Sequence, residues 1–532
     1  MDDHKGLSDG RSRNGDRRHQ TVPTLPTDSF DVVCIGGGTA GMTAARTARG
    51  RGRSVALIEA ERGLGGDCTY WGCVPSKTLI SLASLVRQNQ AHAELGFSGA
   101  PPDFARVMSH QRAVVAAVAH RERAQLFERD GIAVISGPAQ LESPQVVRVG
   151  DRALHAGSVV IATGTDPAMP SISGLERTPY LTNRTIFDLT ELPERLVVLG
   201  GGPIGLELGQ ALARLGSQVT ILEAGDTLLT KDEPDAGRLI EDTLRREGID
   251  VQLGARADRV HARAHGIAVS VTRGGEQREL VADALLVAVG RVPRTGGLGL
   301  EALGVKTDRR GFIEIDRRMR TSQPNLYAAG DVTGGMRFTH VAACEGQIAG
   351  ANTSGARKKS DYRVIPWITF TDPEVAHVGL TEAQARDRHG DQIRVASYPM
   401  RLVDRAAITG RPEGFITLVT RQRGRIGRAT GGTLLGAQIV GAEAGELIHE
   451  AVIAMQARSF AGRLAQAVHA YPSMSVGVQQ TAAQLFADGR ILAPVDDEAP
   501  PDQTQPVTPG RECRVALALR QNRRDAPGGQ DA

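Results

Sequence analysis

The chain has 532 residues, enough for about three or four domains. Its 41% hydrophobic content and net charge of +3 are typical of a globular protein and give no electrostatic case for a nucleic-acid partner. It has no apolar run of 18 residues to span a membrane and only five cysteines, too few for a disulfide-stapled secreted protein, so we expect a cytoplasmic enzyme.

The two ends of the chain lack a periodic apolar pattern. Residues 1–29 are polar and predict a disordered N-terminal arm. Residues 491–532 are rich in Pro, Asp and Gln and predict a disordered C-terminal tail, which carries Cys513. The ordered part is therefore expected between these two segments.

The first ordered element is the apolar run Val32–Ile35, which predicts a buried parallel strand. A GxGxxG loop follows it at once. There Gly36 permits a tight turn, Gly38 lets the backbone approach a pyrophosphate, and Gly41 allows close packing of helix on strand. Glu59 closes the next strand, where an acid can bind ribose hydroxyls. This unit predicts a dinucleotide site, with the helix N-terminus facing the phosphates.

The block GGDCTYWGCVPSK, residues 65–77, carries the most chemistry. Four residues separate Cys68 from Cys73, which is close enough for a small-loop disulfide if the chain bends at Gly72. A helix-forming stretch follows from Thr78, so both thiols should lie near a helix N-terminus, where the thiolate is favoured. The alternative to a redox-active pair is two ordinary buried thiols. The glycines crowded around the pair favour the redox-active pair, because they allow another backbone segment to approach closely.

The remaining cysteines and the metal question give less specific signals. Cys34 in a strand and Cys344 in a probable helix are expected to be small core residues. A metal site would need further ligands beside the cysteine pair, and no second CxxC or histidine cluster is present. No metal site is predicted.

The strand–loop–helix–strand unit of residues 31–59 recurs at residues 195–223. Its loop glycines are Gly200, Gly202 and Gly205, and Glu223 closes its second strand. A glutamate there favours the 2′-hydroxyl of NAD and repels the 2′-phosphate of NADP, so NADH is the favoured donor. Two such units predict two nucleotides held by successive domains.

The last ordered stretch, residues 363–490, has no nucleotide signal. Phe415–Thr420 and Leu435–Val440 have the pattern of strands, and Gly445–Ala457 that of a helix. An α+β domain is predicted.

Together these residues resemble the class I pyridine nucleotide–disulfide oxidoreductases, from residue 31 to about 487. The resemblance implies an α/β fold with two Rossmann-like dinucleotide-binding domains, for FAD and NAD(P), and a C-terminal α+β dimerisation domain. The implied order is FAD-binding (30–160), NAD(P)-binding (161–288), FAD-binding again (289–362) and dimerisation (363–490).

The resemblance also assigns single residues. The family's ATG segment at a domain crossover is matched by residues 162–164, ending at Gly164. The second FAD motif is matched by residues 326–331, which include Gly330, and Asp331 would hydrogen-bond the ribityl chain. Lys77 and Glu207 occupy the positions of an ion pair beside the flavin.

The implied activity is electron transfer from NAD(P)H through FAD to a Cys68–Cys73 disulfide. Cys73 would be the thiolate nearest the flavin, and Cys68 the interchange thiol that meets the acceptor, a small molecule or a metal ion. The family is homodimeric, and its active site is composite because a C-terminal segment reaches the partner's cysteines.

That C-terminal segment departs from the pattern HxHPTxxE of the disulfide reductases. His469 matches the first histidine, but Tyr471 replaces the catalytic one and Val476 the orienting glutamate. An ordinary tyrosine is a poor base at neutral pH. Tyr471 would instead donate a hydrogen bond or contact a soft metal ion, and mercuric reductase also has a tyrosine near this position. This resemblance favours Tyr471 as a catalytic-site residue of a mercuric-reductase-like enzyme, whose acceptor is Hg(II)–thiolate, a quinone or another electrophile.

Two alternatives are a dihydrolipoyl dehydrogenase and a redox-sensing flavoprotein with little turnover. The mercuric-reductase interpretation itself lacks two features of that branch. Only Cys513 lies beyond the core instead of a terminal cysteine pair, and no separate metal-binding domain with a CxxC precedes the first strand.

Overall fold

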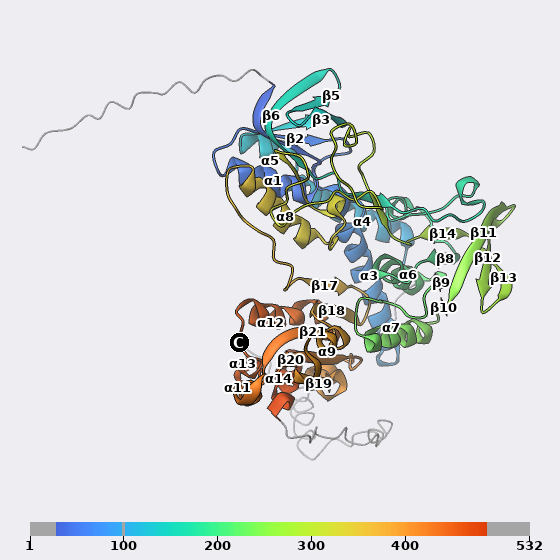
Figure 1. Cartoon of the computed structure of the whole chain (residues 1–532). Helices are drawn as coiled ribbons and strands as arrows, with labels where there is room; N and C mark the ends of the chain where they lie inside the picture. Colours follow the sequence, from blue (N-terminus) through green and yellow to red (C-terminus); the bar gives the residue numbers. More distant parts are fainter. Residues whose placement is uncertain (1–27, 98–101, 487–532) are drawn as a thin grey trace, which may run out of the picture. The chain divides into compact units, whose positions relative to one another are not determined.

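The computed structural model describes residues 28–97 and 102–486 (Figure 1). The predicted arm up to residue 27 and the predicted tail with Cys513 lie outside the described residues. Within the described part, no helix is long and apolar enough to cross a bilayer. The fold is α/β with a separate C-terminal α+β domain, which confirms the predicted fold class.

The first sheet has seven strands, and its parallel part follows the order β3-β2-β1-β6, with β16 beside β6. Its strands are β1 (Ser29–Ile35), β2 (Val55–Glu59), β3 (Ile132–Ser136), β4 (Ala139–Ser143), β5 (Val146–Val149), β6 (Arg152–Ile161) and β16 (Leu326–Ala328). The helices that follow β2 in the chain are α2 (Gly66–Tyr70), α3 (Cys73–Ala91), α4 (Phe104–His120) and α5 (Ala124–Arg129). The unit β1–turn–helix–β2 is the first predicted repeat, and it is confirmed.

Two helices from distant parts of the sequence cross beside this sheet at very short range. They are α1 (Thr39–Arg49) and α8 (Thr339–Asn352). A Cβ atom placed on Gly346 would lie 2.2 Å from the carbonyl oxygen of Ala40, and one on Gly350 would lie 2.3 Å from that of Ala44. Only glycine fits at these two positions, so α8 is fixed against α1 with its N-terminus beside the first glycine loop.

The second predicted repeat is confirmed as well. It forms a four-stranded parallel sheet in the order β10-β9-β8-β14, joined to an antiparallel sheet in the order β11-β12-β13. The elements are β8 (Arg195–Leu199), α6 (Pro203–Leu215), β9 (Gln218–Glu223), α7 (Pro234–Arg246), β10 (Asp250–Leu253), β11 (Ala255–Arg263), β12 (Gly266–Arg273), β13 (Glu276–Ala282) and β14 (Ala284–Val287). The short strands β7 (Thr165–Pro167) and β15 (Arg291–Pro293) pair where the chain enters and leaves this part.

The C-terminal domain is a five-stranded antiparallel sheet, in the order β17-β18-β21-β20-β19, with helices beside it. Its strands are β17 (Pro366–Thr369), β18 (Glu374–Gly379), β19 (Ile393–Pro399), β20 (Phe415–Arg421) and β21 (Thr433–Gly441). Its helices are α9 (Glu382–His389), α10 (Asp404–Ile408), α11 (Gly424–Ala429), α12 (Ala444–Gln456), α13 (Gly462–Gln466) and α14 (Val476–Ala483). The two strands and the helix expected here are present within two residues of their predicted bounds.

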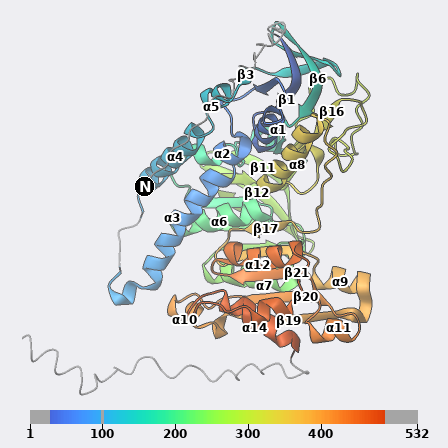
Figure 2. The same cartoon turned by 90° about the vertical axis from the view of Figure 1, so that its left-hand side faces the viewer.

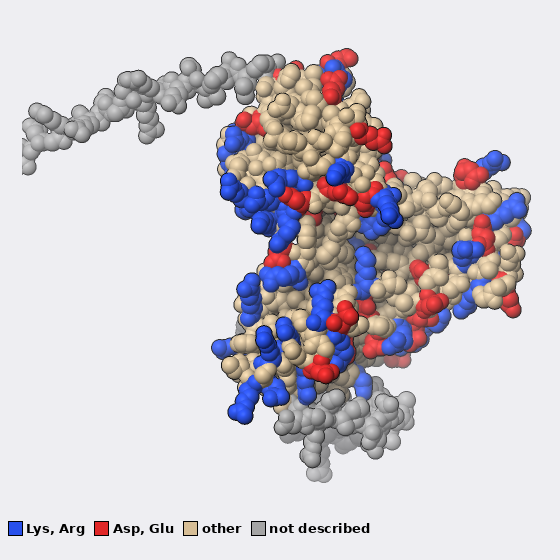
Figure 3. Space-filling model, viewed as in Figure 1, with Lys and Arg blue, Asp and Glu red and all other residues tan. Residues whose placement is uncertain are grey.

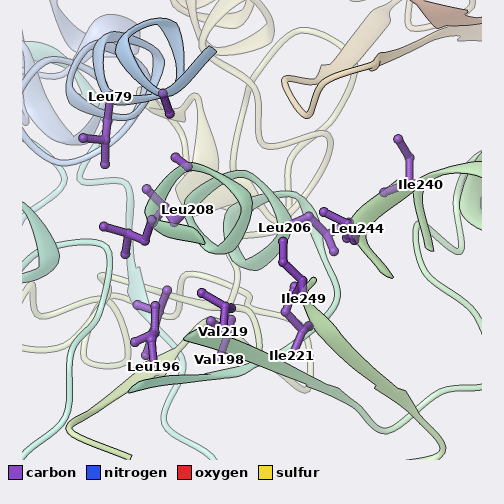
Figure 4. Close-up of a cluster of buried hydrophobic side chains, with 14 of the residues drawn as sticks. Leu79, Leu196, Val198, Leu206, Leu208, Val219, Ile221, Ile240, Leu244 and Ile249 are labelled. Carbon is purple, nitrogen blue, oxygen red and sulfur yellow. The ribbon is translucent and has the colours of Figure 1, made fainter. Parts of the chain in front are cut away.

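One apolar core joins the two nucleotide-type parts. Side chains of α6 and α7 pack on the second sheet, and Leu79 from α3 packs against Leu208 and its neighbours (Figure 4). The long helix α3 therefore runs along α6 (Figure 2). Because α3 begins at the second cysteine, this packing sets the position of the redox block relative to the second repeat.

Charged side chains of both signs are spread over the face in Figure 3, with Lys and Arg more numerous over the C-terminal domain. Arg423, Arg425 and Arg428 lie exposed around α11. This local excess is hidden in the overall net charge of +3.

The α1–α8 crossing predicts a specific sensitivity to side-chain size. Gly346→Val places three carbons where the Ala40 carbonyl lies, and we expect a loss of about 2–3 kcal/mol in the free energy of unfolding, as for other overpacked cores. Gln347→Val, at an exposed neighbour on the same helix, should cost less than about 1 kcal/mol. Urea unfolding followed by circular dichroism measures both. Equal losses would contradict the close-packing account.

Candidate functional site

A cavity of about 950 Å³ brings the separate motifs together. Both glycine loops, the cysteine block and the end of β16 line it, as do Trp367, Ile368 and Thr369 of β17. All of the predicted site residues line this cavity except Gly41, Gly205 and Tyr471. Segments as far apart in the sequence as Ile35 and Thr369 thus line one cavity.

The first loop has a different geometry at each of its three glycines. Gly36 has φ +106°, and a Cβ on it would lie 2.3 Å from the carbonyl oxygen of Ala162. A Cβ on Gly41 would lie 1.8 Å from the carbonyl oxygen of Gly36, which reflects the close packing of α1. A Cβ on Gly38 would meet only the Cα of Gly66, at 3.9 Å. Gly38 therefore leaves its backbone open to the cavity.

The second loop repeats this geometry position by position. Gly200 has φ +111°, and its Cβ would lie 2.6 Å from the carbonyl oxygen of Ala288. A Cβ on Gly205 would lie 2.0 Å from the carbonyl oxygen of Gly200, whereas one on Gly202 would meet nothing within 4 Å. Each loop thus has a strained turn, an open glycine and a packing glycine, the arrangement that dinucleotide phosphates require.

The two distal glutamates also correspond. Glu59 accepts hydrogen bonds of 2.7 Å from the N–H groups of Gly37 and Glu61. Glu223 accepts bonds of the same length from the N–H groups of Gly201 and Gly225. Each carboxylate is therefore fixed beside its loop, and its remaining lone pairs are available to a ribose.

The residues near the end of β16 fit a polar cofactor. The Nη1 atom of Arg337 is buried on the cavity wall and has no hydrogen-bond partner among the described residues. Asp331 accepts a hydrogen bond of 3.2 Å from Thr165, and burial raises its pKa. Gly330 has φ +79°, and Gly164, at φ +73°, has no atom within 4 Å of its Cβ position. An unpartnered guanidinium N–H beside a partly buried acid and open backbone suits a ligand that carries both phosphates and hydroxyls.

The two cysteines are in contact. Cys68 lies in α2, Cys73 is the first residue of α3, and both are free thiols linked by a hydrogen bond. The helix therefore begins five residues earlier than the expected Thr78, with the thiol at its N-terminus. Cys73 also lies 3.3 Å from the hydroxyl of Thr339, the first residue of α8.

This environment separates the two sulfurs electrostatically. The hydrogen bond from the Cys68 thiol, with smaller contributions from Thr339 and the charge of Lys77, outweighs desolvation and lowers the pKa of Cys73 from 9.0 to about 6. The same hydrogen bond, together with burial, raises the pKa of Cys68. Cys73 is thus the thiolate at neutral pH, and Cys68 retains the proton.

Lys77 and Glu207 form the ion pair expected from the sequence, with a distance of 2.7 Å between Nζ and Oε2. The other oxygen of Glu207 accepts a 2.9 Å hydrogen bond from the backbone N–H of Phe370, and Lys77 lies 4.6 Å from the centre of the Phe370 ring. These contacts join α3, α6 and the entry to the C-terminal domain at the cavity wall.

Both tryptophans of the chain, Trp71 and Trp367, line the cavity. Trp71 lies between the two cysteines in the sequence, and the guanidinium of Arg184 lies 4.0 Å from the centre of its ring. Trp367 donates a 2.9 Å hydrogen bond to Asp232, and burial raises the pKa of this acid to about 6. The C-terminal domain thus contributes to the wall near the second glycine loop.

Tyr471 lies elsewhere. It is 73% exposed, and its hydroxyl donates a 2.7 Å hydrogen bond to Asp404. His469 pairs with Glu450 at 3.0 Å, which raises the pKa of the histidine. The structure therefore does not bring Tyr471 to the cysteines of its own chain.

The sequence analysis missed several residues of the site, and one expectation was wrong. Thr339, Arg337, Arg184 and Asp232 were not anticipated; of these, only Thr339 had a local signal, since it starts a helix eight residues after Asp331. Cys34 is buried as expected, but Cys344 is exposed, because it lies on the outer side of α8. Among residues 28–97 and 102–486, no three His, Cys, Asp or Glu side chains are grouped so as to hold a metal ion.

Comparisons with known proteins agree with this geometry. Residues 30–346 match the family described as pyridine nucleotide-disulphide oxidoreductase, and residues 365–482 match the dimerisation domain of that family. A mercuric reductase of Lysinibacillus sphaericus is 35% identical over 475 residues, which are 88% of this chain and 85% of that protein. A dihydrolipoyl dehydrogenase of Thermus scotoductus is also 35% identical, over 466 residues, 86% of this chain and 97% of that protein.

Among solved structures, the HOCl-induced flavoprotein disulfide reductase RclA from Escherichia coli is similar, with a TM-score of 0.76 and 30% identity. The match covers 85% of this chain and 99% of that one. Relatives with different activities are thus about equally similar, so identity alone does not select an acceptor.

The separation of the two thiols predicts a pH dependence. In the reduced protein, alkylation of Cys73 by iodoacetamide should be half-maximal near pH 6, because only the thiolate reacts. Thr339→Val and Cys68→Ala each remove a hydrogen bond to the thiolate, so each should move the midpoint upward, Cys68→Ala further. Mass spectrometry of the Cys73 peptide measures the rate. A midpoint that stays near 9.0 in the unaltered protein would refute the assignment.

Proposed function

The chain belongs to the pyridine nucleotide-disulphide oxidoreductase family, and we propose that it is an FAD-dependent NAD(P)H oxidoreductase that delivers electrons through Cys68 and Cys73 to a mercuric-reductase-like acceptor. The observation that carries the proposal is the hydrogen-bonded thiol pair in a cavity bounded by two glycine loops of the same geometry. The acceptor would be Hg(II)–thiolate, a quinone or another electrophile that meets Cys68.

The residues around the first loop fit FAD, which supplies two-electron exchange between a nicotinamide and a disulfide. Gly38 and the N-terminus of α1 would hold the pyrophosphate, and Glu59 the adenosine ribose. Asp331 and Arg337 would hold the hydroxyl-bearing chain, since both are partly buried on the wall and the buried Nη1 atom of Arg337 has no hydrogen-bond partner in the described part of the chain. The Lys77–Glu207 pair would lie beside the flavin ring.

The chain's own groups divide the chemistry at sulfur between them. Cys73 is poised as a thiolate by Cys68, Thr339 and the N-terminus of α3, so it is the sulfur suited to exchange electrons with the cofactor. Cys68 keeps its proton and is the sulfur suited to attack an acceptor once that proton leaves. Reduction of the disulfide yields one thiolate and one thiol, which matches these two opposite pKa shifts.

The second loop is proposed to bind NADH in preference to NADPH. Glu223 is fixed by the backbone N–H groups of Gly201 and Gly225, so its charge lies beside the second loop, where a 2′-phosphate would be repelled. A cation, Lys231, also lines the cavity. It lies eight residues after Glu223 in the sequence and so does not directly follow the second strand of the unit.

A homodimer with a composite active site is proposed from the dimerisation domain and from the exposure of Tyr471. The alternative of a dihydrolipoyl dehydrogenase is supported by relatives of that name at the same identity. Tyr471 disfavours it, because a general base contributes about 10²–10⁴-fold to such reactions. A redox sensor with little turnover is disfavoured by the activated Cys73.

The thiol mechanism predicts the behaviour of Cys68→Ser. Anaerobic NADH oxidation with Hg(II)–thiolate as acceptor should fall by more than about 10²-fold, because the exchanging sulfur is lost, while flavin content stays unchanged. Cys344→Ser, which removes an exposed thiol outside the cavity, is the matched control and should keep full activity. The same assay with lipoamide compares the alternatives. Brisk lipoamide turnover, or unchanged mercury turnover in Cys68→Ser, would contradict the proposal.

The nucleotide preference predicts a result for Glu223→Ala. The ratio of kcat/KM for NADH to that for NADPH should fall about 10-fold or more, since a charged hydrogen bond to the 2′-hydroxyl is lost and repulsion of phosphate is relieved. Glu59→Ala changes the corresponding residue of the first loop. It should lower flavin content and leave the ratio unchanged. A ratio that responds equally to both variants would count against the assignment of the loops.

A further inference from the structure

Tyr471 has an acidic partner from another element of the same domain. Its hydroxyl donates to Oδ2 of Asp404 at 2.7 Å, and Asp404 is the first residue of α10. The position five residues beyond Tyr471, where an orienting acid was expected by resemblance, holds Val476 instead. An acid is therefore present beside residue 471, supplied by a segment 67 residues earlier in the chain.

The hydrogen bond determines what the phenol can offer. A tyrosine hydroxyl has one proton and two lone pairs. Because the phenolic proton is donated in the hydrogen bond to Asp404, only lone pairs of the oxygen are left to face outward. The hydrogen bond and the negative charge of Asp404 both raise the pKa of Tyr471, so the phenol stays protonated at neutral pH. The pair as a whole carries a single negative charge.

The pair lies on a surface that is exposed in one copy of the chain. Val468 is 98% exposed, Tyr471 73% and Ile408, on α10, 62%. All three belong to the residues that match the dimerisation domain. Large apolar side chains exposed this fully on such a domain are typical of a surface that a second copy covers.

We propose that Asp404 is a positioning residue for Tyr471. Its hydrogen bond fixes the ring on the dimer face and holds the phenolic proton, so that Tyr471 turns an oxygen lone pair toward the partner subunit's Cys68. In this arrangement Tyr471 neither removes a proton from that thiol nor gives one to it. This inference rests on the proposed function, because it requires the composite site. It deepens that function by naming the class of acceptor: one whose reaction with the Cys68 thiol releases the sulfur's proton to solvent and needs no base from the protein.

A proton relay through the pair is the competing explanation. In a relay, a thiol would give its proton to the phenol oxygen while the phenolic proton passed to the carboxylate. Carboxylic acids are about four pKa units more acidic than thiols, so the relayed state would be populated about 10⁴-fold less than the starting state. The relay is too unfavourable to replace a histidine, which holds a proton near neutral pH.

The other titratable groups around the pair do not change this conclusion. Burial and, to a smaller extent, the charge of Asp404 raise the pKa of Tyr398, whose hydroxyl donates to the carbonyl of Leu402. His469 is held by Glu450 and by the carbonyl of Ala467. Asp404 is the one charged group whose interaction shifts Tyr471 in the described part of the chain.

The decisive test restores a titratable base at position 471. We expect Tyr471→His to raise NADH-dependent lipoamide reduction by at least about 10²-fold, because a general base contributes that much and Asp404 would orient the imidazole. In Tyr471→His combined with Asp404→Ala, less than a tenth of this gain should be left, and the acidic limb of the pH profile should move to lower pH, because the carboxylate no longer stabilises the imidazolium. Flavin content and dimer mass serve as controls for folding.

A second measurement needs no acceptor. The phenolate absorbance of the holoenzyme is titrated against pH in the unaltered protein and in Asp404→Ala. The titration of the matching Tyr471→Phe variant is subtracted from each, so that the difference belongs to Tyr471. Tyr471 should ionise at lower pH without Asp404. The proposal is overturned if this titration is unchanged, if the gain in lipoamide turnover is independent of Asp404, or if Tyr471→His gives no gain. Failure of the proposed function would appear separately, as acceptor turnover that survives Cys68→Ser.

Discussion

The contact of two glycine segments, backbone against backbone, determines where the chemistry of this protein can occur. The N–H of Gly65 donates to the carbonyl of Gly37 at 2.9 Å, and a Cβ on Gly66 would lie 2.8 Å from the Cα of Gly38. No side chain separates the cysteine block from the phosphate loop. Because α2 and α3 follow Gly65 directly, the two thiols are held at a fixed position beside the first glycine loop. Both glycine segments are needed for this position.

A second constraint joins this frame to the rest of the molecule through buried charge. Glu207 on α6 connects Lys77 of α3 to the backbone at Phe370. On the same helix Arg214, whose side chain is 6% exposed, pairs with both Glu247 and Asp372. Charges removed from water to this extent are tolerated only when they are paired and hydrogen-bonded. The helix α6 is thus specified by polar contacts on one side and by the apolar core on the other, so the C-terminal domain is held to the wall of the cavity.

The sequence predicted what is encoded locally. The two dinucleotide units, their glycine roles and the reactive cysteine block follow from short spacings, and the structure contains these elements with glycine geometries that match. Contacts between distant segments were beyond prediction. Arg184 covers Trp71 and Asp404 holds Tyr471, although nothing in the neighbouring sequence marks either contact. Thr339 starts a helix, but this local signal does not reveal that it reaches Cys73. Cys344 was misplaced for a similar reason, because a nearly uniform run of small residues does not reveal which side of α8 faces inward. The roles of the site residues and the domain limits stay predictions.

The placement of the two tryptophans has a consequence for how this protein can be observed. Trp71 and Trp367 are the only indoles in the chain, and both lie on the wall of the cavity, one beside the cysteines and one on the C-terminal domain. Tryptophan fluorescence of the protein therefore comes entirely from its site. Emission would follow the occupancy and redox state of the cavity, and unfolding of the outer sheets could pass unseen by this signal.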